Sequence, residues 1–402
     1  MASQSWKTKT VSECLVPVSV TGKVKIQTRD YKPTGRFPII DQGQDPIAGW
    51  TDDESAIIDA PLPLIVFGDH TRVFKFVEHP FARGADGTQL LRPTTGIDPL
   101  FFFYACRSID LEGRGYNRHF SILKEREVSY PEDENAQRSL GRVLRHTELS
   151  LKQQDSAIES ALPLKNAAMR ELFTRGLRGE TQKDTDIGAM PQSWNPTNID
   201  AVAKRTQYGL SQRGQSHGAT PILRMNCQLN GKAVFRDLQF VDLDEPTLAD
   251  FKLEPGDILF NRTNSIEHVG RTAIFETEEA AVFASYLVRL SVDKDRCDPR
   301  FLNHYMNWPH VQSEIKKLAS RAVGQANINA SKLRTVIFPL PPTLEEQAEI
   351  VDVIDAIDRK IDLHKRKRAV LEDLFRTLLH KLMIGEIDVN ALDLSALPAT
   401  NA

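Results

Sequence analysis

The chain lacks the features that mark secreted or membrane proteins. Its four cysteines, Cys14, Cys106, Cys227 and Cys297, show no Cys-x-x-Cys spacing, which argues against a zinc site and a disulfide framework. The first ten residues lack the apolar core of a signal peptide, and the longest apolar run, 99–105, is far shorter than a membrane span. We therefore expect a cytoplasmic protein with reduced, buried thiols and no membrane partner.

The chain also lacks recognisable active-site motifs. The P-loop, the dinucleotide-binding G-x-G-x-x-G, H-E-x-x-H and G-x-S-x-G patterns are all missing. The Asn/Asp-Pro-Pro-aromatic motif, with which an amino-methyltransferase holds a flipped base, is missing too. The ten histidines show no ligand-like clustering. We predict no catalytic residue, no metal site and no bound cofactor.

A positive net charge is missing as well. The formal charge is −3, with part of the acidic surplus in residues 131–134 and 242–254. Phosphate contacts depend on the charge that faces the DNA groove rather than on the sum over the chain. The net charge therefore lowers the expectation of DNA binding without excluding it.

What the chain has is an internal repeat. The matched pairs are Gln4-Ser5-Trp6 with Gln192-Ser193-Trp194, Gly35-x-x-Pro38-Ile39 with Gly218-x-x-Pro221-Ile222, Ile65-Val66-Phe67 with Ile258-Leu259-Phe260, Leu90-Leu91-Arg92 with Leu287-Val288-Arg289, and Asp98-Pro99-x-Phe101 with Asp298-Pro299-x-Phe301. The spacing of about 200 residues far exceeds the roughly 20–50 residues of solenoid repeats. It predicts a duplicated pair of domains that acts on something with two positions.

Each repeat ends in a long heptad pattern that predicts a helix. The apolar or seam positions of the first are Leu140, Leu144, Thr147, Leu151, Ile158 and Leu162, and those of the second are Ile350, Ile354, Ile357, Ile361, Leu371, Phe375 and Leu378. Thr343-x-x-Glu346 is typical of a capping box, and Pro163 is expected to kink or interrupt the first helix. The simplest packing is antiparallel; two unrelated dimerisation helices are the alternative.

The corresponding strand ends of the two repeats differ. The polar residues that follow them are Asp69, His70, Thr71 and Arg72 in the first repeat, and Arg262, Thr263 and Asn264 in the second. Arginine can pair with guanine, asparagine with adenine, and aspartate can accept from cytosine. A common scaffold with different tips suits two readers of different half-sites, although a polar hairpin turn is the plainer interpretation of either stretch.

A second polar stretch precedes the last strand of each repeat. It spans 113–118 in the first repeat and 324–329 in the second, and it supplies the candidate residues Asn117, Arg118, Gln325 and Asn327. Side chains and backbone N–H groups of this kind bind phosphates. An ordinary loop remains the alternative.

Several of these stretches resemble the DNA-specificity subunit of type I restriction–modification systems. The residues that carry the resemblance are Pro191-x-x-Trp194, Pro221-Ile222-Leu223-Arg224, Gly256-Asp257-Ile258-Leu259-Phe260-x-Arg262-Thr263, Gly324-Gln325-x-Asn327-Ile328, Phe338-Pro339-Leu340-Pro341-Pro342 with Gln347, and, in the first half, Phe67–Arg72, Gly84–Gly87 and Gln137. The first half is the weaker match, because it lacks the Pro-Pro before its helix.

The resemblance implies an α+β fold with two similar α/β target-recognition domains, separated by two long helices that pack as an antiparallel coiled coil with pseudo-twofold symmetry. The expected boundaries are 1–131 and 186–342 for the recognition domains, 132–185 and 343–390 for the spacer helices, and 391–402 for a tail. The implied partners are double-stranded DNA, two methyltransferase subunits docked on the helices, and an ATP-dependent translocase and restriction subunit.

Two other classes of function stay open at this stage. A two-headed adaptor would bind proteins through the coiled coil without reading DNA sequence. An enzyme with an unrecognised active site is disfavoured by the missing motifs. The target sequence cannot be deduced, since one residue type can meet several bases and DNA shape adds specificity without contact.

Overall fold

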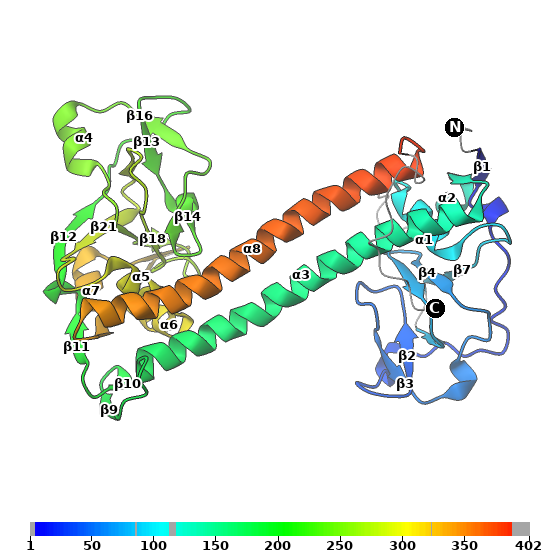
Figure 1. Cartoon of the computed structure of the whole chain (residues 1–402), viewed down its shortest axis with the longest axis horizontal. Coiled ribbons are helices and arrows are strands. Elements are labelled where there is room, and N and C mark those ends of the chain that lie inside the picture. The colour runs from blue at the N-terminus through cyan, green and yellow to red at the C-terminus, as the bar shows by residue number, and fades with distance from the viewer. Residues whose placement is uncertain (1–4, 85–86, 112–117, 323, 388–402) are drawn as a thin grey trace. The chain divides into compact units, whose positions relative to one another are not determined.

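The computed structural model describes residues 5–84, 87–111, 118–322 and 324–387. The chain divides into two compact units: unit 1 is Met1–Asp155 with Lys365–Ala402, and unit 2 is Ser156–His364. Each unit contains a sheet-rich domain and part of two long helices, α3 (Glu134–Arg175) and α8 (Leu344–Met383) (Figure 1). None of the described helices combines the length and the apolar character needed to cross a membrane.

Three small sheets and two short helices form the domain of unit 1. Its strands are β1 (Trp6–Thr10), β2 (Phe37–Ile40), β3 (Gly49–Thr51), β4 (Leu64–Gly68), β5 (Phe74–Val77), β6 (Ala82–Arg83), β7 (Thr88–Leu91) and β8 (Glu127–Pro131), and its helices are α1 (Pro99–Ser108) and α2 (Phe120–Glu125). The sheet orders are β1-β8, β3-β2-β6 and β5-β4-β7. The fully buried β4 lies at the centre of its sheet, as expected for a continuous apolar run.

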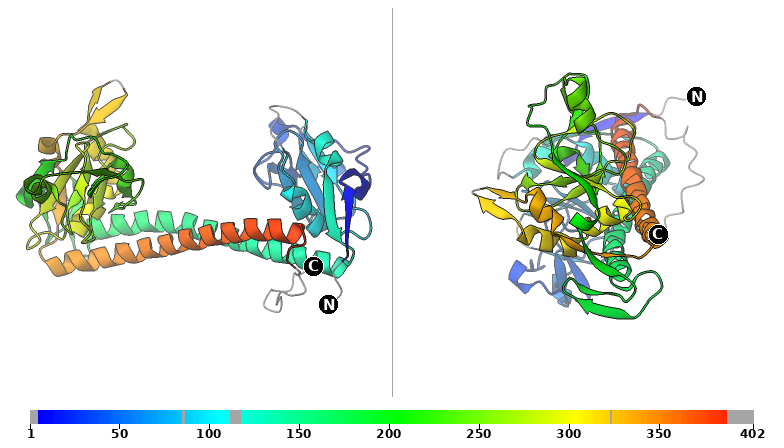
Figure 2. Two further views of the ribbon diagram at one scale, coloured as in Figure 1. Left: turned by 90° about the horizontal axis from the view of Figure 1, so that it is seen from above. Right: turned by 90° about the vertical axis from the view of Figure 1, so that its left-hand side faces the viewer.

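Unit 2 has the same plan with more strands (Figure 2). Its strands are β9 (Gln182–Thr185), β10 (Gly188–Pro191), β11 (Asn195–Asn198), β12 (Ala203–Tyr208), β13 (Thr220–Leu223), β14 (Gln228–Leu229), β15 (Lys232–Ala233), β16 (Gln239–Val241), β17 (Ile258–Asn261), β18 (Thr263–Asn264), β19 (Thr272–Ile274), β20 (Val282–Phe283), β21 (Leu287–Val292), β22 (Ser320–Ala322), β23 (Gln325–Asn327) and β24 (Ile337–Leu340). Its shorter helices are α4 (Glu245–Phe251), α5 (Pro299–Asn307), α6 (Pro309–Lys317) and α7 (Ala330–Arg334). The main sheet has the order β12-β21-β17-β19-β15-β14, beside β16-β13-β20 and β18-β23-β22.

The strand registers confirm the internal repeat and correct one part of it. Ile39 and Ile222 each sit on a strand with one antiparallel and one parallel neighbour, as the matched sequences predict. In the main sheets, however, Leu91 pairs with Ile65, whereas Leu290 pairs with Ile258. The structural equivalent of Leu91 is therefore Leu290, so the match of Leu90-Leu91-Arg92 with Leu287-Val288-Arg289 is out of register. Short apolar runs look alike, and the strand partner decides their alignment.

The matched residues Asp98 and Asp298 each stand at the start of a helix. The Asp98 carboxylate accepts a hydrogen bond from the Phe101 N–H at 2.9 Å, and the Asp298 carboxylate accepts one from the Arg300 N–H at 2.8 Å. The proline that follows each aspartate loses no hydrogen bond at the first helical position. The capped helices α1 and α5 place their apolar faces in the two cores, with Phe101 and Phe301 fully buried.

The two long helices run antiparallel within each unit, which confirms the expected coiled coil. In unit 1, Leu140 and Leu144 share a core with Leu382, while Asp155 pairs with Arg368 further along. In unit 2, Phe173 shares a core with Ile350 and Ile354, while Lys165 pairs with Asp358. Most predicted seam positions are buried or half-buried, but Leu162 is 47% exposed, so its assignment to the seam is wrong.

Helix α3 continues through Pro163, so the predicted interruption there is wrong. A proline removes one backbone N–H and displaces the carbonyl four residues earlier, here that of Glu159. Both Pro163 and Glu159 are exposed, so water can hydrogen-bond the freed carbonyl. Packing of α3 on both sides of the proline, at Ala161 and Met169, holds the helix together.

A buried glutamine attaches the sheet domain of unit 1 to its helix. The side-chain carbonyl of Gln137 accepts a hydrogen bond from the Asp98 N–H at 2.7 Å. Its amide donates to the backbone carbonyls of Gly96 and Pro131, at 3.0 and 2.8 Å. The side chain is fully buried, so these backbone groups have no water as an alternative partner. We call this arrangement the glutamine clasp.

Unit 2 contains the same clasp around Gln347. Its side-chain carbonyl accepts from the Asp298 N–H at 2.7 Å, and its amide donates to the carbonyls of Arg296 and Pro341 at 3.2 and 3.4 Å. Gln347 is 1% exposed. The repeat therefore extends to individual hydrogen bonds, and each recognition domain is fixed to its long helix in the same way.

Candidate nucleic-acid interface

In unit 2, the two predicted polar stretches meet in one ribbon of strands. β18 pairs with β23, which lies next to β22, with Thr263 opposite Asn327 and Asn264 opposite Ala326. The Asn327 amide donates to the Thr263 hydroxyl at 2.6 Å. Residues about sixty positions apart in the sequence thus form a single polar surface, which we call the β18–β23 ribbon (Thr263–Asn264 with Gln325–Asn327). A two-stranded ribbon is one of the elements that fit the major groove.

Arg262 lies at the base of the β18–β23 ribbon and is oriented by an aromatic ring. Its guanidinium stands 4.7 Å from the centre of the Tyr208 ring and donates to the Ser285 carbonyl at 3.4 Å. The side chain is half-buried, and its Nε atom has no hydrogen-bond partner among the described residues. A cation–π contact of this kind restrains an arginine without occupying all its donors. The buried Nε is not accessible to a ligand, so the donors that Arg262 can offer to one are its terminal N–H groups.

Two tyrosines beside Arg262 were missed in the sequence. Tyr208 is 43% exposed and Tyr286 is 49% exposed, and the Tyr286 carbonyl accepts the Arg262 backbone N–H at 3.0 Å. Exposed rings next to a basic side chain are a usual feature of nucleic-acid surfaces. Neither tyrosine lies in the two polar stretches selected from the sequence. The only sequence signal for them is an aromatic residue at or next to the end of a strand.

The other ribbon residues differ in how far the protein uses their side chains. The Asn264 amide lies 3.2 Å from the Met225 sulfur, and its carbonyl accepts the Ser265 N–H at 2.8 Å. Gln325 is exposed, and its side chain makes no hydrogen bond with another described residue. Gln325 is thus freer than Asn264, which must exchange partners to reach a base.

In unit 1, the structure corrects the role of Asp69. This side chain is only 3% exposed, and its carboxylate accepts the Phe120 N–H at 2.8 Å, at the start of α2. Its backbone N–H donates to the Gly87 carbonyl at 2.7 Å. Because the side chain is buried and one of its oxygens binds the start of α2, Asp69 holds neighbouring loops together and is not presented at the surface for a base.

The rest of that loop forms a tight turn between β4 and β5. The Thr71 hydroxyl donates to the Gln42 carbonyl at 2.6 Å, and the His70 N–H donates to the Gln42 side chain at 3.3 Å. A Cβ atom at Gly68 would stand 2.2 Å from the Thr71 hydroxyl, so the turn requires glycine. The half-buried His70 and Thr71 thus depend on Gln42, which the sequence did not indicate.

Arg72 is the exposed member of this turn. Its backbone has a φ of 62°, and its guanidinium donates to the Leu111 carbonyl at 2.6 Å. Arg118 is also exposed, whereas Asn117 lies outside the described residues. In the part of unit 1 that the structure describes, no strand pair corresponds to the β18–β23 ribbon. The two units therefore share a scaffold but present different surfaces at the predicted tips.

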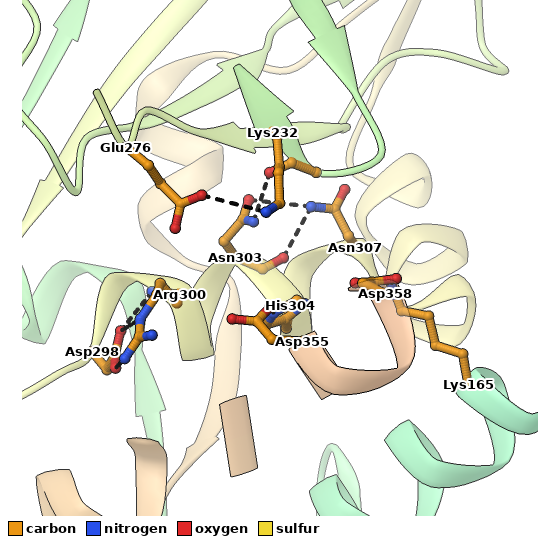
Figure 3. A network of polar contacts seen from close by, with 11 residues as sticks. Lys165, Lys232, Glu276, Asp298, Arg300, Asn303, His304, Asn307, Asp355 and Asp358 are labelled. Carbon is orange, nitrogen blue, oxygen red and sulfur yellow. Dashed lines mark hydrogen bonds and ion pairs between the residues drawn. The ribbon is translucent and has the colours of Figure 1, made fainter. Parts of the chain in front are cut away.

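A cluster at the junction of α5 and α8 brings a histidine next to two carboxylates (Figure 3). His304 Nε2 lies 2.8 Å from an Asp355 oxygen, and the Lys165 ammonium lies 2.7 Å from both Asp358 oxygens. The ligand atoms of the three acidic and imidazole groups fall within 4.8 Å of one another. Sequence spacing did not show this clustering. Because Lys165 already neutralises Asp358, the geometry is that of a polar contact holding α5 on the helices.

The electrostatics of this contact depend on the neighbours of Asp355. Burial alone would raise the pKa of the Asp355 carboxyl, but the hydrogen bond and charge of His304 outweigh it, so that the pKa lies below its ordinary value. The carboxylate is therefore ionised at neutral pH. The contact supports the sheet-rich domain on its helices and lies outside the β18–β23 ribbon.

The equivalent contact in unit 1 uses a different set of residues. The Tyr104 hydroxyl and the Arg107 guanidinium both donate to the Glu148 carboxylate, at 2.9 and 2.8 Å. Burial alone would raise the pKa of the Glu148 carboxyl. The charge of Arg107 and the two hydrogen bonds have a larger, opposite effect, so the pKa lies below its ordinary value. The interaction therefore stabilises unit 1 only while Glu148 is ionised.

Replacing Glu148 by glutamine is expected to reduce the free energy of unfolding by about 1–3 kcal/mol at pH 7, because a charged hydrogen-bond acceptor is lost. A carboxyl with a lowered folded pKa gives stability that is present above its unfolded pKa, near 4.5, and is lost as the pH falls through the folded value. The difference between wild type and Glu148→Gln should thus shrink below pH 4.5 in urea titrations. A pH-independent difference, or an equal loss in the exposed control Glu159→Gln, would contradict this assignment.

Comparison with known proteins gives matches to about half of this chain. A family model described as the type I restriction modification DNA specificity domain matches residues 193–373. The putative type I restriction enzyme MjaX specificity subunit of Methanocaldococcus jannaschii is 30% identical over 206 residues, which is 50% of this chain and 48% of that protein. The EcoKI specificity subunit of Escherichia coli K12 is 26% identical over 215 residues, 52% and 46% of the two chains. The chain thus spans about half the length of the relatives it matches.

Solved structures extend the likeness of the fold to nearly the whole chain. The S subunit of a type I restriction–modification system from M. genitalium superimposes with a TM-score of 0.67 at 15% identity, over 95% of this chain and 97% of that one. A chain from a structure of type I R-M complex assembly and conformational transition gives a TM-score of 0.52 at 17% identity. These comparisons show that residues 193–373 belong to the family of type I restriction modification DNA specificity domains, and that the chain shares its fold with solved S subunits of such systems.

Proposed function

We propose that this chain is the sequence-specific DNA-binding subunit of a type I system, and that it reads a split, asymmetric site. The observation that carries the proposal is the duplicated scaffold with different tips. Unit 2 presents the β18–β23 ribbon with Arg262, and unit 1 presents a tight turn with Arg72. One such surface for each half-site accounts for an asymmetric target. The relatives are specificity subunits, which suggests a non-catalytic role for this chain.

The proposed contacts with DNA follow from the exposure of the predicted residues. In unit 2 they are Arg262, Thr263, Asn264, Gln325 and Asn327, joined by the exposed rings of Tyr208 and Tyr286. In unit 1 they are His70, Thr71, Arg72 and Arg118, with Asp69 in a supporting role, and Asn117, which lies outside the described residues, is kept from the sequence alone. Arginine and asparagine are suited to purine edges, and the remaining polar groups are suited to phosphates.

We further propose that two methyltransferase subunits dock on the long helices, and that an ATP-dependent restriction subunit joins this complex. The helices carry exposed apolar side chains that no described part of the chain covers: Leu149, Leu162, Leu164, Val353, Leu363, Val370 and Leu374. Val370 is 68% exposed. Apolar side chains repeated along a helix surface are typical of a protein interface. Methylation and cleavage would then reside in the partners.

Selection of binding sites from a random duplex library tests the proposed function. The probe is the full chain assembled with its methyltransferase subunits, at a fixed salt concentration because phosphate contacts are salt-dependent. We expect enrichment of two short defined sequences separated by an undefined spacer of constant length. An assembled complex that enriches no sequence would instead identify the chain as an adaptor without DNA readout.

The paired helices are proposed to set the spacer length. A heptad can be inserted into α3 between Asp155 and Lys165 and into α8 between Asp358 and Arg368, which preserves both ion pairs. Seven helical residues add about 10 Å, close to three base pairs of DNA. Site selection with this variant should give unchanged half-sites and a longer spacer. If the variant still selects both half-sites but with the spacer length of the wild type, the helices do not set that length.

A further inference from the structure

A groove of about 770 Å³ in unit 1 runs beside the edge strand β5. Residues of the 40–47 segment, the helices α1 and α3, and residues 109–111 form the rest of its lining. The Gly68 N–H donates to the Val73 carbonyl, so the alternation of an antiparallel ladder turns the backbone groups of Phe74 and Phe76 away from β4 and towards this side. Among the described residues, no strand pairs with this side of β5, so it offers the groove an edge of the kind that accepts another strand.

In unit 2, the chain itself covers the equivalent edge. β19 corresponds to β5, because Ile274 stands opposite Ile258 as Phe76 stands opposite Ile65. The outward N–H of Ile274 donates to the Gly231 carbonyl at 2.9 Å, and β15 pairs with β19 in parallel. The Asn303 amide of α5 donates to the same carbonyl at 2.9 Å. An added strand on this edge is thus part of the fold in unit 2.

The difference arises from the length of one connection. The segment between β13 and β16, residues 224–238, is long enough to form β14 and β15, whereas the equivalent segment between β2 and β3 is only 41–48. The residues at the floor of the groove also differ between the two units. Thr272 and Asn303, which are polar and hydrogen-bonded at 2.8 Å, correspond to Phe74 and Phe103 in unit 1. In the described part of unit 1, this edge therefore has no covering strand, and the floor beside it is apolar.

The walls of the groove indicate the chemistry of what would bind there. Ile47 and Leu149 line it and are 37% and 47% exposed. Three cations of the lining are already paired with carboxylates: Lys75 with Asp41, Arg107 with Glu148, and Arg145 with Glu78. Two further cations of the lining, Lys152 and Arg72, have no carboxylate partner among the described residues. Asp110 is the one carboxylate of the described lining without a cation partner, so the unpaired charge of the groove is positive. An extended segment that combines apolar side chains with carboxylates fits these walls.

We propose that an extended segment of a methyltransferase partner adds a strand to β5 in this groove. The inference rests on the proposed function, since Leu149 and Lys152 belong to the helix surface assigned to that partner. Main-chain hydrogen bonds to Phe74 and Phe76 would hold the strand, with its apolar side chains over Ile47 and Leu149 and a carboxylate near Lys152. Unit 2 has no such site, because β15 occupies it. The two recognition domains would then engage their partners differently.

Photo-crosslinking in the assembled complex tests the groove. The photoreactive residue p-benzoylphenylalanine replaces Ile47 or Leu149, and Val24, which is 58% exposed in unit 1 and outside the groove, serves as the control position. We expect both groove positions to crosslink to one short segment of the methyltransferase subunit that carries aspartate or glutamate, and the control position to give no such product. Crosslinks to DNA or to this chain would overturn the proposal.

A substitution series separates this proposal from the proposed function. Leu149→Asp should weaken binding of the methyltransferase subunit at least about tenfold, while Leu149→Met and Val24→Asp should leave it unchanged. If Leu149→Asp binds the methyltransferase subunit as tightly as the wild type and methylation stays sequence-specific, the proposed strand addition in the groove is wrong and the proposed function is not affected. A complex that methylates without sequence preference would overturn the proposed function and this inference with it.

Discussion

Replacing Gln347 by leucine is expected to lower the free energy of unfolding of unit 2 by about 2–4 kcal/mol, because three backbone groups lose their hydrogen bonds to this buried side chain. Leucine fills much the same volume but can neither accept from the Asp298 N–H nor donate to the carbonyls of Arg296 and Pro341. Gln347→Glu should be no better, since a carboxylate cannot donate to these carbonyls and would be buried with its charge.

Urea denaturation combined with hydrogen exchange measures this effect. The amide of Asp298, at the clasp, should exchange faster in Gln347→Leu, and the unfolding midpoint should fall. Gln137→Leu should do the same at Asp98 in unit 1, because the hydrogen bonds are equivalent. The exposed Gln153, on α3, provides the matched control, for which Gln153→Leu should change neither quantity. A loss equal to that of the control would show that the clasp does not hold the domain.

Replacing Arg262 by alanine is expected to relax base preference in one half-site alone. A bidentate contact with a base contributes about 1–3 kcal/mol of discrimination, so the preferred base at one position should lose roughly tenfold or more in selectivity. The prediction depends on the position of Arg262 at the base of the β18–β23 ribbon and on its restraint by Tyr208. Arg72→Ala should act in the same way on the other half-site.

Site selection with the assembled complex distinguishes base contacts from phosphate contacts. Arg296 is a matched control, because it is an exposed arginine that also donates to a backbone carbonyl, that of Ala201, at 2.6 Å. It lies beyond Val292, at the end of β21 away from the ribbon. Arg296→Ala should leave both half-sites unchanged. If Arg262→Ala weakens all sequences equally, Arg262 binds a phosphate and not a base.

Much of the fold could be predicted because its signals are local. The caps at Asp98 and Asp298 and the heptad positions around Ile350 and Leu140 depend on residues close in sequence, and the structure contains all of them. The β18–β23 ribbon could be predicted only in part. Both polar stretches could be identified in the sequence, but their pairing as neighbouring strands depends on how the chain folds between them.

The errors share one physical cause: local pattern does not show which way a side chain faces. Asp69 looks like an exposed polar residue in a turn, but the start of α2 captures its carboxylate. Leu162 fits the heptad spacing, yet it faces outward on α3. The alignment of Leu91 with Leu290 depends on strand partners far away in the sequence. Tertiary contacts decide each of these cases.

Mapping DNA methylation in cells with and without this chain tests the central claim most directly, provided that its methyltransferase partners are present in both. The account predicts methylated adenines within a split asymmetric motif that disappears when the chain is removed. It further predicts that Arg262→Ala changes only one half of that motif and Arg72→Ala only the other. Methylation that is unchanged without the chain, or a motif in which both substitutions alter the same half, would contradict the account.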